Sequence, residues 1–233
     1  MTHLKVTAEL SSPLAGDAPY LDSILEYQMA LIEGRCMALT RAQPAPVAGE
    51  VHLPILRGAI GGVEQIPRCS APIIAPEQIR HEHFAKRIAV EHADCLANNQ
   101  RLVVATGNSW TKAYRLPLKI SSVSRVVWFV GGNDSQRNGQ RSPRKTILSV
   151  LRRVESIGKK RSQGYGRVFK WTAEETPDDW SWFAPSEHGQ VLMRALPFCD
   201  QLPSGLIGFK RDFGACVPPL WHPDRHMEIV TPC

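Results

Sequence analysis

The sequence predicts an α+β fold in which strands and helices follow the order βαββαβ, with an insertion in the middle. Three observations predict it: an alternating apolar pattern at the start, two stretches with helical apolar spacing, and a glycine-rich loop between the second helix and the last strand. With 233 residues and 43% hydrophobic side chains, the chain is long enough to bury a substantial core.

The first half of the pattern is strand, helix, strand. Apolar and polar residues alternate over 4–10, which is the period of a half-buried strand. Apolar residues at helical spacing predict a helix over 20–33, and Gly34 would end it. A proline-rich linker at 43–50 then leads to a second expected strand near 51–56.

The second half resumes with an expected strand near 119–130. A helix is expected over 143–157, because Ser142 can cap its start, a proline follows, and apolar residues recur at helical spacing. Gly158 would end this helix as a glycine just past its last turn. A short strand over 166–171 completes the βαββαβ order.

This order is that of the ferredoxin-like unit found in RNA-recognition (RRM-like) domains. We expect it to occupy 1–57 and 118–175. The stretch 58–117 is rich in Gly and Pro, includes an expected polar helix near 77–98, and is predicted to be a thumb-like insertion. Residues 176–233 are expected to form a C-terminal β extension.

Charge is distributed very unevenly. Between Arg137 and Lys170 the chain carries 11 of its 28 Lys and Arg residues and a single acid, Glu155. The rest of the chain holds 17 basic and 21 acidic residues. A cationic stripe on a slightly acidic body predicts a polyanionic partner. A solvated basic face remains the alternative interpretation.

The densest part of the stripe is a glycine-rich loop that follows a helix. Nucleotide-binding loops instead follow a strand and open a helix, so that backbone amides face the phosphate. No Gly-Lys-Ser or Gly-Lys-Thr occurs in the chain. The sequence therefore argues against an ATP or NAD site, and no cofactor is expected. Here the side chains must supply the attraction, while Gly164 and Gly166 let the backbone approach a ligand.

The loop offers both phosphate-binding and base-stacking groups, which favours single-stranded nucleic acid. Tyr165 lies between the glycines, where its ring could stack on a base. The expected binding residues of the loop are Gly158, Lys159, Lys160, Arg161, Gly164, Tyr165, Gly166 and Arg167. Candidate contacts to RNA or DNA in the other half of the stripe are Arg137, Arg141, Arg144 and Lys145.

Metal and membrane sites are not expected. The six cysteines are widely spaced, without a Cys-x-x-Cys pair. His81-Glu82-His83, with His92 and Cys95, resembles a ligand set, but solvated histidines are the favoured interpretation. The longest strongly apolar run, 126–130, is too short to span a bilayer, so the protein is expected in the cytoplasm.

The glycine loop resembles that of the RAMP superfamily of CRISPR-associated RNA-binding proteins. Its mark is a basic glycine-rich loop between the last helix and last strand of a ferredoxin-like domain. The matching segments here are Gly158-Lys159-Lys160-Arg161 and Gly164-Tyr165-Gly166-Arg167. Within the superfamily, the chain is similar to the Cas-five-like third Csf subunit of type IV systems, in segments 10–17, 112–117 and 218–221 and at Leu21-Asp22.

The resemblance implies a subunit that grips the 5′ handle of the crRNA and caps the backbone filament of the effector complex. Its implied partners are the crRNA handle, the RAMP backbone subunit and the large subunit, with target duplex DNA as a further candidate. Lys112, Tyr114 and Arg115 are then expected at the base of the thumb, near the RNA.

A second function within the same resemblance is metal-independent processing of crRNA. Cleavage of RNA without a metal needs a general base near the 2′-hydroxyl. The loop and the expected helix before it contain no histidine. A binding role without catalytic residues is therefore the favoured prediction.

Overall fold

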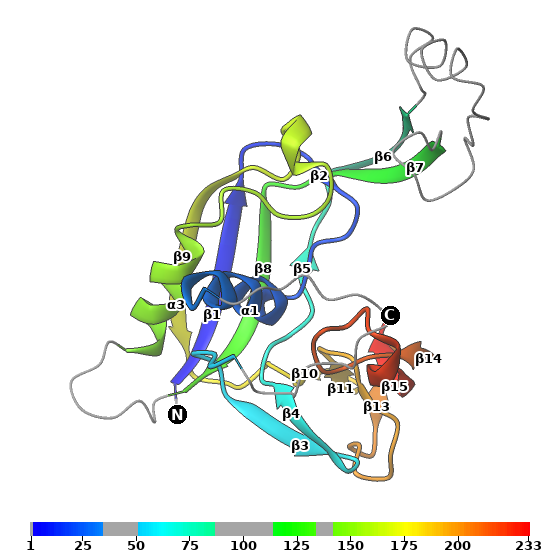
Figure 1. Ribbon diagram of the computed structural model, residues 1–233. Helices are drawn as coiled ribbons and strands as arrows, with labels where there is room; N and C mark the ends of the chain where they lie inside the picture. Colours follow the sequence, from blue (N-terminus) through cyan, green and yellow to red (C-terminus); the bar gives the residue numbers. More distant parts are fainter. Residues whose placement is uncertain (1, 35–50, 87–113, 134–141) are drawn as a thin grey trace, which may run out of the picture.

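A computed structural model describes residues 2–34, 51–86, 114–133 and 142–233. It is a mixed α/β fold built mostly from antiparallel sheets (Figure 1). Its described part divides into a body, formed by a central sheet with helices on one face, and a lower β-rich part that contains the C-terminus. A hairpin projects from the upper end of the body.

The central sheet has the strand order β5-β8-β1-β9 within the described ranges. Its strands are β1 (Thr2–Leu10), β5 (Ile73–Ile74), β8 (Arg125–Gly132) and β9 (Val168–Thr176). All three neighbouring pairs are antiparallel. Strand β1 lies inside the sheet because it pairs with both β8 and β9. It is half-buried because Leu4, Val6 and Ala8 point into the core and its polar residues point the other way. The expected first strand is thus confirmed.

Helices α1 (Leu21–Ile32) and α3 (Pro143–Leu151) cover one face of this sheet. Their apolar residues join the β1 side chains in the main core, together with Trp128. The expected first helix is confirmed nearly to the residue. The second starts where expected but ends at Leu151, six residues before the predicted end.

The predicted extension of α3 to Gly158 is wrong because the backbone there bonds to β9 instead of continuing the helix. Ile157 N–H donates to Gly166 O at 2.9 Å, and Val168 N–H donates to Glu155 O at 2.8 Å. Val154 and Ile157 are nevertheless buried in the main core, as their apolar spacing indicated. The spacing identified the buried residues but not their backbone conformation.

The expected strand near 51–56 is also wrong. Val51, Leu53 and Ile55 alternate and are buried, but they form only an isolated bridge, between Ile55 and Gly132. Pro54 lacks an amide hydrogen and so cannot donate a ladder hydrogen bond, although its carbonyl accepts one from Asn133 N–H at 3.3 Å. The strand next to β8 is instead β5, a two-residue strand at Ile73–Ile74.

The projecting hairpin is formed by β6 (Gln78–Lys86) and β7 (Tyr114–Ser122), with β2 (Leu14–Ala15) on the far side of β7. The helix expected near 77–98 is therefore wrong over 78–86, and its remainder lies outside the described residues. Nine successive residue pairs join β6 to β7. The expected strand near 119–130 is split between β7 and β8.

The lower part combines an early hairpin with the C-terminal strands. Strands β3 (Arg57–Ile60) and β4 (Val63–Pro67) form that hairpin. The C-terminal strands are β10 (Phe183–Ser186), β11 (Gly189–Leu192), β12 (Leu196–Pro197), β13 (Leu206–Ile207), β14 (Phe209–Gly214) and β15 (Met227–Pro232). Ile60 and Ile66 pack with Trp182 and with residues of these strands in a second core.

A buried ion pair connects α1 to the lower part. Arg194 and Asp22 are 1% and 0% exposed, and Arg194 Nη2 lies 2.9 Å from Asp22 Oδ2. The same guanidinium donates to Cys69 O and Cys216 O, each at 3.0 Å. Because four segments meet at this one side chain, the pair fixes the lower part against the body.

The segment 58–117, expected as one thumb-like insertion, is divided among several sheets where it is described. The β3–β4 hairpin packs in the lower part, β5 is an edge of the central sheet, and β6 belongs to the projecting hairpin. Within the described ranges, no helix is long and apolar enough to cross a membrane.

Candidate nucleic-acid interface

The glycine-rich loop 158–167 is held to the body by its own backbone. Lys159 N–H donates to Ala15 O, and Gly166 N–H donates to Pro13 O, both at 2.8 Å. Arg167 N–H donates to Ser12 Oγ at 2.8 Å. Backbone hydrogen bonds therefore set the path of the loop, and its exposed cations Lys159, Arg161 and Arg167 face solvent.

The three glycines of the loop all adopt positive φ, for which glycine is the favoured residue. At Gly166 a Cβ would collide with Ile157 O, and at Gly158 it would lie 2.7 Å from Leu14 Cδ1. At Gly164 a Cβ would meet nothing within 4 Å. Gly158 and Gly166 therefore allow a close approach to the protein's own segments, and the approach to a ligand expected at Gly164 and Gly166 stays a prediction.

A loop that directly follows a helix would face the negative end of the helix dipole, which repels anions. The negative end of a helix dipole acts within about one turn. Because α3 ends at Leu151, the loop begins beyond that reach. The short 3-10 helix η1 (Arg161–Gln163) follows within the loop itself.

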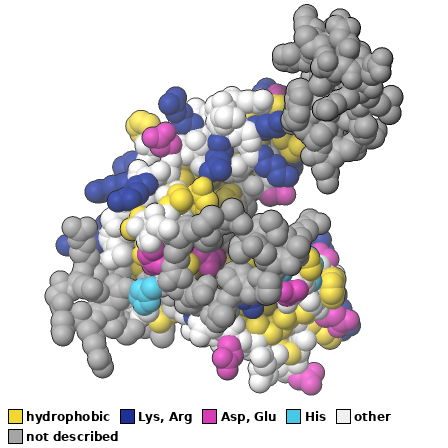
Figure 2. Space-filling model, in the orientation of Figure 1, with side chains coloured by type: hydrophobic (Ala, Val, Ile, Leu, Met, Phe, Trp, Pro, Cys, Tyr) yellow, Lys and Arg dark blue, Asp and Glu magenta, His cyan; other side chains and the backbone are white. Residues whose placement is uncertain are grey.

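Exposed cations lie along the loop and form its charged surface. Lys159, Arg161 and Arg167 are exposed. Lys160 is half-buried, and its Nζ lies 4.8 Å from the centre of the Phe84 ring. Lys160 also has a positive φ of 55°, which is uncommon for a residue with a side chain. Figure 2 shows Lys and Arg gathered over the upper part of this face and acidic residues more frequent over the lower part.

Tyr165 packs against the β6–β7 hairpin. Its hydroxyl donates to Glu82 Oε2 at 2.7 Å, and its ring meets the Phe84 ring edge-on with centroids 5.8 Å apart. The hydrogen bond to Glu82 raises the pKa of Tyr165 above its ordinary value. An edge-on contact with a single ring leaves a face of Tyr165 uncovered, so stacking of this ring on a base stays a prediction.

The expected contacts at the base of the thumb are only partly described. Lys112 lies outside the described residues, and Tyr114 is the first residue of β7. Arg115 is exposed on β7 and pairs with Ala85 of β6. Two further cations of this hairpin, Arg80 and Lys119, were not singled out by the sequence. Arg80 is held by Glu82 at 2.8 Å.

In the second half of the stripe, Arg137 and Arg141 lie outside the described residues. Arg144 Nε donates to Ala173 O at 2.7 Å, which ties the first turn of α3 to β9. A basic residue at a helix N-terminus is unfavourable to the helix because it faces the positive end of the dipole. The bond to Ala173 O gives a structural reason for Arg144 at this position. Lys145 is exposed.

The sheet face opposite the helices does not extend the cationic surface. Lys5 lies opposite Glu174 in the β1–β9 register, and Glu9 lies opposite Lys170. Arg125 pairs with Glu9 on the other side. Because positive and negative side chains alternate on this face, it is less suited to a polyanion than the glycine loop.

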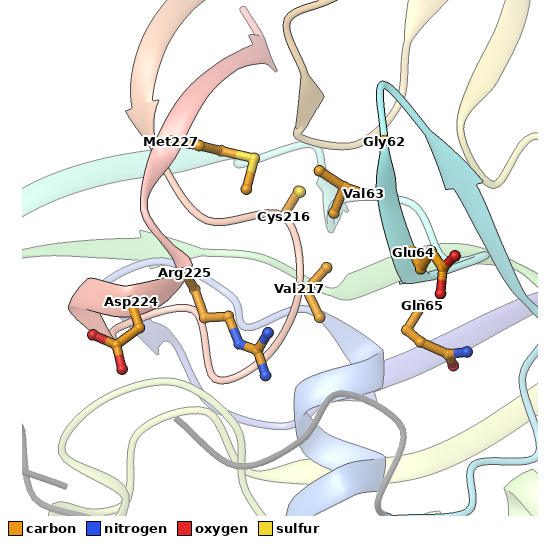
Figure 3. Close-up of a pocket in the computed structure, with 9 residues that line it drawn as sticks. All are labelled: Gly62, Val63, Glu64, Gln65, Cys216, Val217, Asp224, Arg225 and Met227. Carbon is orange, nitrogen blue, oxygen red and sulfur yellow. The ribbon is translucent and has the colours of Figure 1, made fainter. Parts of the chain in front are cut away.

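A cavity of about 490 Å³ lies elsewhere, between β4 and the C-terminal segment (Figure 3). Glu64 and Asp224 contribute carboxylates to its lining, and Arg225 contributes a guanidinium. Val217 and Met227 add apolar surface. The two carboxylates make this cavity a poor site for nucleic acid.

A groove that no sequence pattern predicted lies between α1 and the segment 154–161. Tyr27 lines it and is 45% exposed. Tyr27 and Leu31 lie four residues apart on α1 and are both exposed, so they share its outer side. A helical projection of residues 20–33 places Tyr27 and Leu31 on the same side, but apolar spacing alone does not distinguish an exposed apolar side from one that faces the core.

Within the described ranges, no cluster of three or more His, Cys, Asp or Glu side chains is placed to hold a metal ion. Comparison of the chain with models of known protein families and with curated protein sequences gave no match.

Proposed function

We propose that this protein binds single-stranded RNA through the glycine-rich loop 158–167. In its specific form, the proposal is a non-catalytic RAMP-superfamily subunit that grips the 5′ handle of the crRNA in a type IV CRISPR effector complex. The observation that carries the proposal is a loop with exposed Lys159, Arg161 and Arg167 whose conformation is fixed by backbone hydrogen bonds.

A basic loop with a held backbone suits RNA because it keeps positive side chains close to where the phosphates of a bound strand would lie. Contacts to phosphates supply most of the affinity of such interfaces, and binding costs less entropy when the backbone that carries the cations is already held. No acidic residue occurs between Gly158 and Lys170. A single strand can follow this loop without meeting a repulsive charge in it.

The topology of the body supports the finer fold assignment. The order β5-β8-β1-β9, with α1 before β5 and α3 between β8 and β9, is the order expected of a ferredoxin-like domain. In that assignment β5 is the second strand of the unit, and the glycine loop joins its second helix to its last strand. This is the position of the RAMP glycine loop.

The environment of Tyr165 supports binding without cleavage. A general base for the 2′-hydroxyl must lose its proton near neutral pH. The hydrogen bond to Glu82 raises the pKa of Tyr165, which makes it a weaker candidate for that role. His81 and His83 alternate with Glu82 along β6, so they lie on the opposite face from Tyr165's partner.

The test is RNA binding measured by fluorescence anisotropy over a series of salt concentrations. We expect the double substitution Arg161→Ala and Arg167→Ala to weaken binding of a mixed-sequence single-stranded RNA. Each lost phosphate contact should reduce the log–log salt slope by about 0.7. The matched control is Lys210→Ala with Arg211→Ala, which removes two exposed cations from the lower part. Equal losses in the two double variants would refute a specific role for the loop.

Incubation of the protein with a labelled CRISPR-repeat RNA in EDTA separates binding from processing. Tight binding of intact RNA is the expected result. Cleavage at a defined position would replace the binding subunit with a metal-independent endoribonuclease of the same fold.

For the assembled complex, we propose that the β6–β7 hairpin and the segment beyond it reach the adjacent backbone subunit. Replacing 87–113 with a short Gly-Ser linker should preserve handle binding but abolish co-purification with the backbone subunit. Normal co-purification would remove this role.

Contact of Arg137 and Arg141 with target duplex DNA predicts that their charge reversal lowers DNA binding without affecting crRNA loading.

A further inference from the structure

A groove of about 310 Å³ lies directly beside the glycine loop, between α1 and the segment that enters the loop. Its volume is at the lower end of the range for small-molecule sites. The described residues that line it come from two stretches of chain: Pro19, Ser23, Ile24, Tyr27 and Gln28, and Val154, Ser156, Ile157, Gly158 and Arg161. None of these lining residues is acidic.

Both walls of the groove are fixed before any ligand binds. One wall is α1, anchored in the core by Leu21 and Leu25. The other is held by the Ile157 N–H bond to Gly166 O and by the Trp171 Nε1 bond to Val154 O at 3.0 Å. A preformed groove loses little entropy when it is filled.

The lining combines an exposed aromatic ring with a polar edge. Tyr27 is 45% exposed, and Ile24 lies one turn before it on α1. Ser23, Gln28 and Ser156 provide hydroxyl and amide groups that both donate and accept hydrogen bonds. A nucleobase has the matching chemistry, because it presents two aromatic faces and a polar edge.

Arg161 belongs to the groove and to the cationic loop at once. A strand whose phosphates contact this loop therefore has a site for one of its bases immediately beside them. We propose that the groove is a base pocket that takes one splayed nucleobase of the bound RNA, stacked on Tyr27. This inference rests on the proposed RNA-binding function and adds to it a stacking residue outside the glycine loop.

A protein partner is the competing occupant, since Leu31 and Ile32 continue an exposed apolar strip along α1. The groove itself favours the base. Its lining includes the Arg161 guanidinium and the polar side chains of Ser23, Gln28 and Ser156. Leu31 and Ile32 lie outside it.

The test compares RNA with and without bases. The probes are oligoadenylate, oligouridylate and an abasic ribose-phosphate chain of equal length, so the result does not depend on binding register. Tyr27→Ala should weaken binding of the base-bearing probes by roughly 5- to 150-fold. It should leave binding of the abasic chain unchanged. Tyr27→Phe, which keeps the ring, should retain affinity for all three probes.

The control is Leu31→Ala, which removes an exposed apolar side chain one turn further along α1. It should affect none of the probes. Equal loss for base-bearing and abasic probes in Tyr27→Ala, or no loss for any probe, would overturn the base pocket while the RNA-binding function stands. Failure of the wild-type protein to bind any probe would overturn both. Self-association that is lost in both Tyr27→Ala and Leu31→Ala would identify the strip as a protein interface and refute the pocket.

Discussion

The glycine-loop region and the C-terminal region use arginine in opposite ways. Residues 142–170 contain nine Lys and Arg and one acid, and most of these cations are exposed. Residues 176–233 contain four Lys and Arg and seven acids, and Arg194 is almost completely buried. Guanidinium groups therefore present charge to solvent in the first region, whereas in the second the guanidinium of Arg194 connects segments of the chain.

The difference lies in what holds each backbone in place. The loop is fixed by backbone bonds such as that of Lys159 N–H with Ala15 O, so its cations contribute little to its shape. At the other site, the carbonyls of Cys69 and Cys216 depend on the Arg194 side chain for donors. Removal of charge should therefore affect binding in the first region and folding in the second.

The largest expected effect follows from Asp22→Ala, which leaves the buried Arg194 guanidinium without its carboxylate. Breaking a buried pair in this way costs about 3–5 kcal/mol of unfolding free energy. Urea denaturation followed by circular dichroism measures this loss. The control is Asp212→Ala, which breaks an exposed pair with Lys210 and should cost about 0–1 kcal/mol. Similar losses in the two variants would show that burial does not distinguish these pairs.

The next largest loss of unfolding free energy is expected at one glycine of the loop and not at another. Gly166→Ala places a Cβ against Ile157 O at positive φ and should cost more than about 2 kcal/mol. Gly164→Ala also has positive φ but meets no neighbour, so it should cost only about 1 kcal/mol. Urea midpoints of the two variants provide the comparison. A larger loss for Gly164→Ala would contradict the close approach described for Gly166.

The sequence predicted burial in this protein better than it predicted backbone conformation. Alternation identified β1 and helical spacing identified α1, because in both the pattern extends over many residues. At Val154 and Ile157 the apolar spacing was correct, but backbone bonds across the glycine loop to the start of β9 decided the conformation. Such pairing depends on how the loop folds back, which apolar spacing does not encode.

The candidate site shows the same limit. The cations and glycines of 158–167 are evident from the local sequence alone. The packing of Tyr165 on Glu82 and Phe84 could not, because β6 was expected to be helical and lies more than 80 residues earlier. The groove at Tyr27 needs both α1 and the loop to be placed, so only the three-dimensional arrangement defines it.

A smaller effect is expected from titration of Tyr165 at high pH. Its hydrogen bond to Glu82 raises the folded-state pKa above the ordinary value of about 10. The bond therefore stabilises the fold fully below pH ~10, and this stabilisation is lost as the pH rises through the folded pKa. Tyrosinate absorbance of wild type minus Tyr165→Phe should show a transition above pH ~10. A transition at or below that pH would mean that the hydrogen bond is absent in solution.

The smallest effect is the most direct test of the comparison between the two regions. The double variant Arg161→Ala and Arg167→Ala should retain its unfolding free energy within about 0.5 kcal/mol, because exposed cations on a backbone-held loop contribute little to stability. At low salt, removal of like charges from the basic stripe should increase stability slightly, because their repulsion is then less screened. Urea denaturation at two salt concentrations measures both quantities. A loss comparable to that of Asp22→Ala would show that these arginines hold the loop, and any accompanying loss of RNA binding would then reflect misfolding instead of missing phosphate contacts.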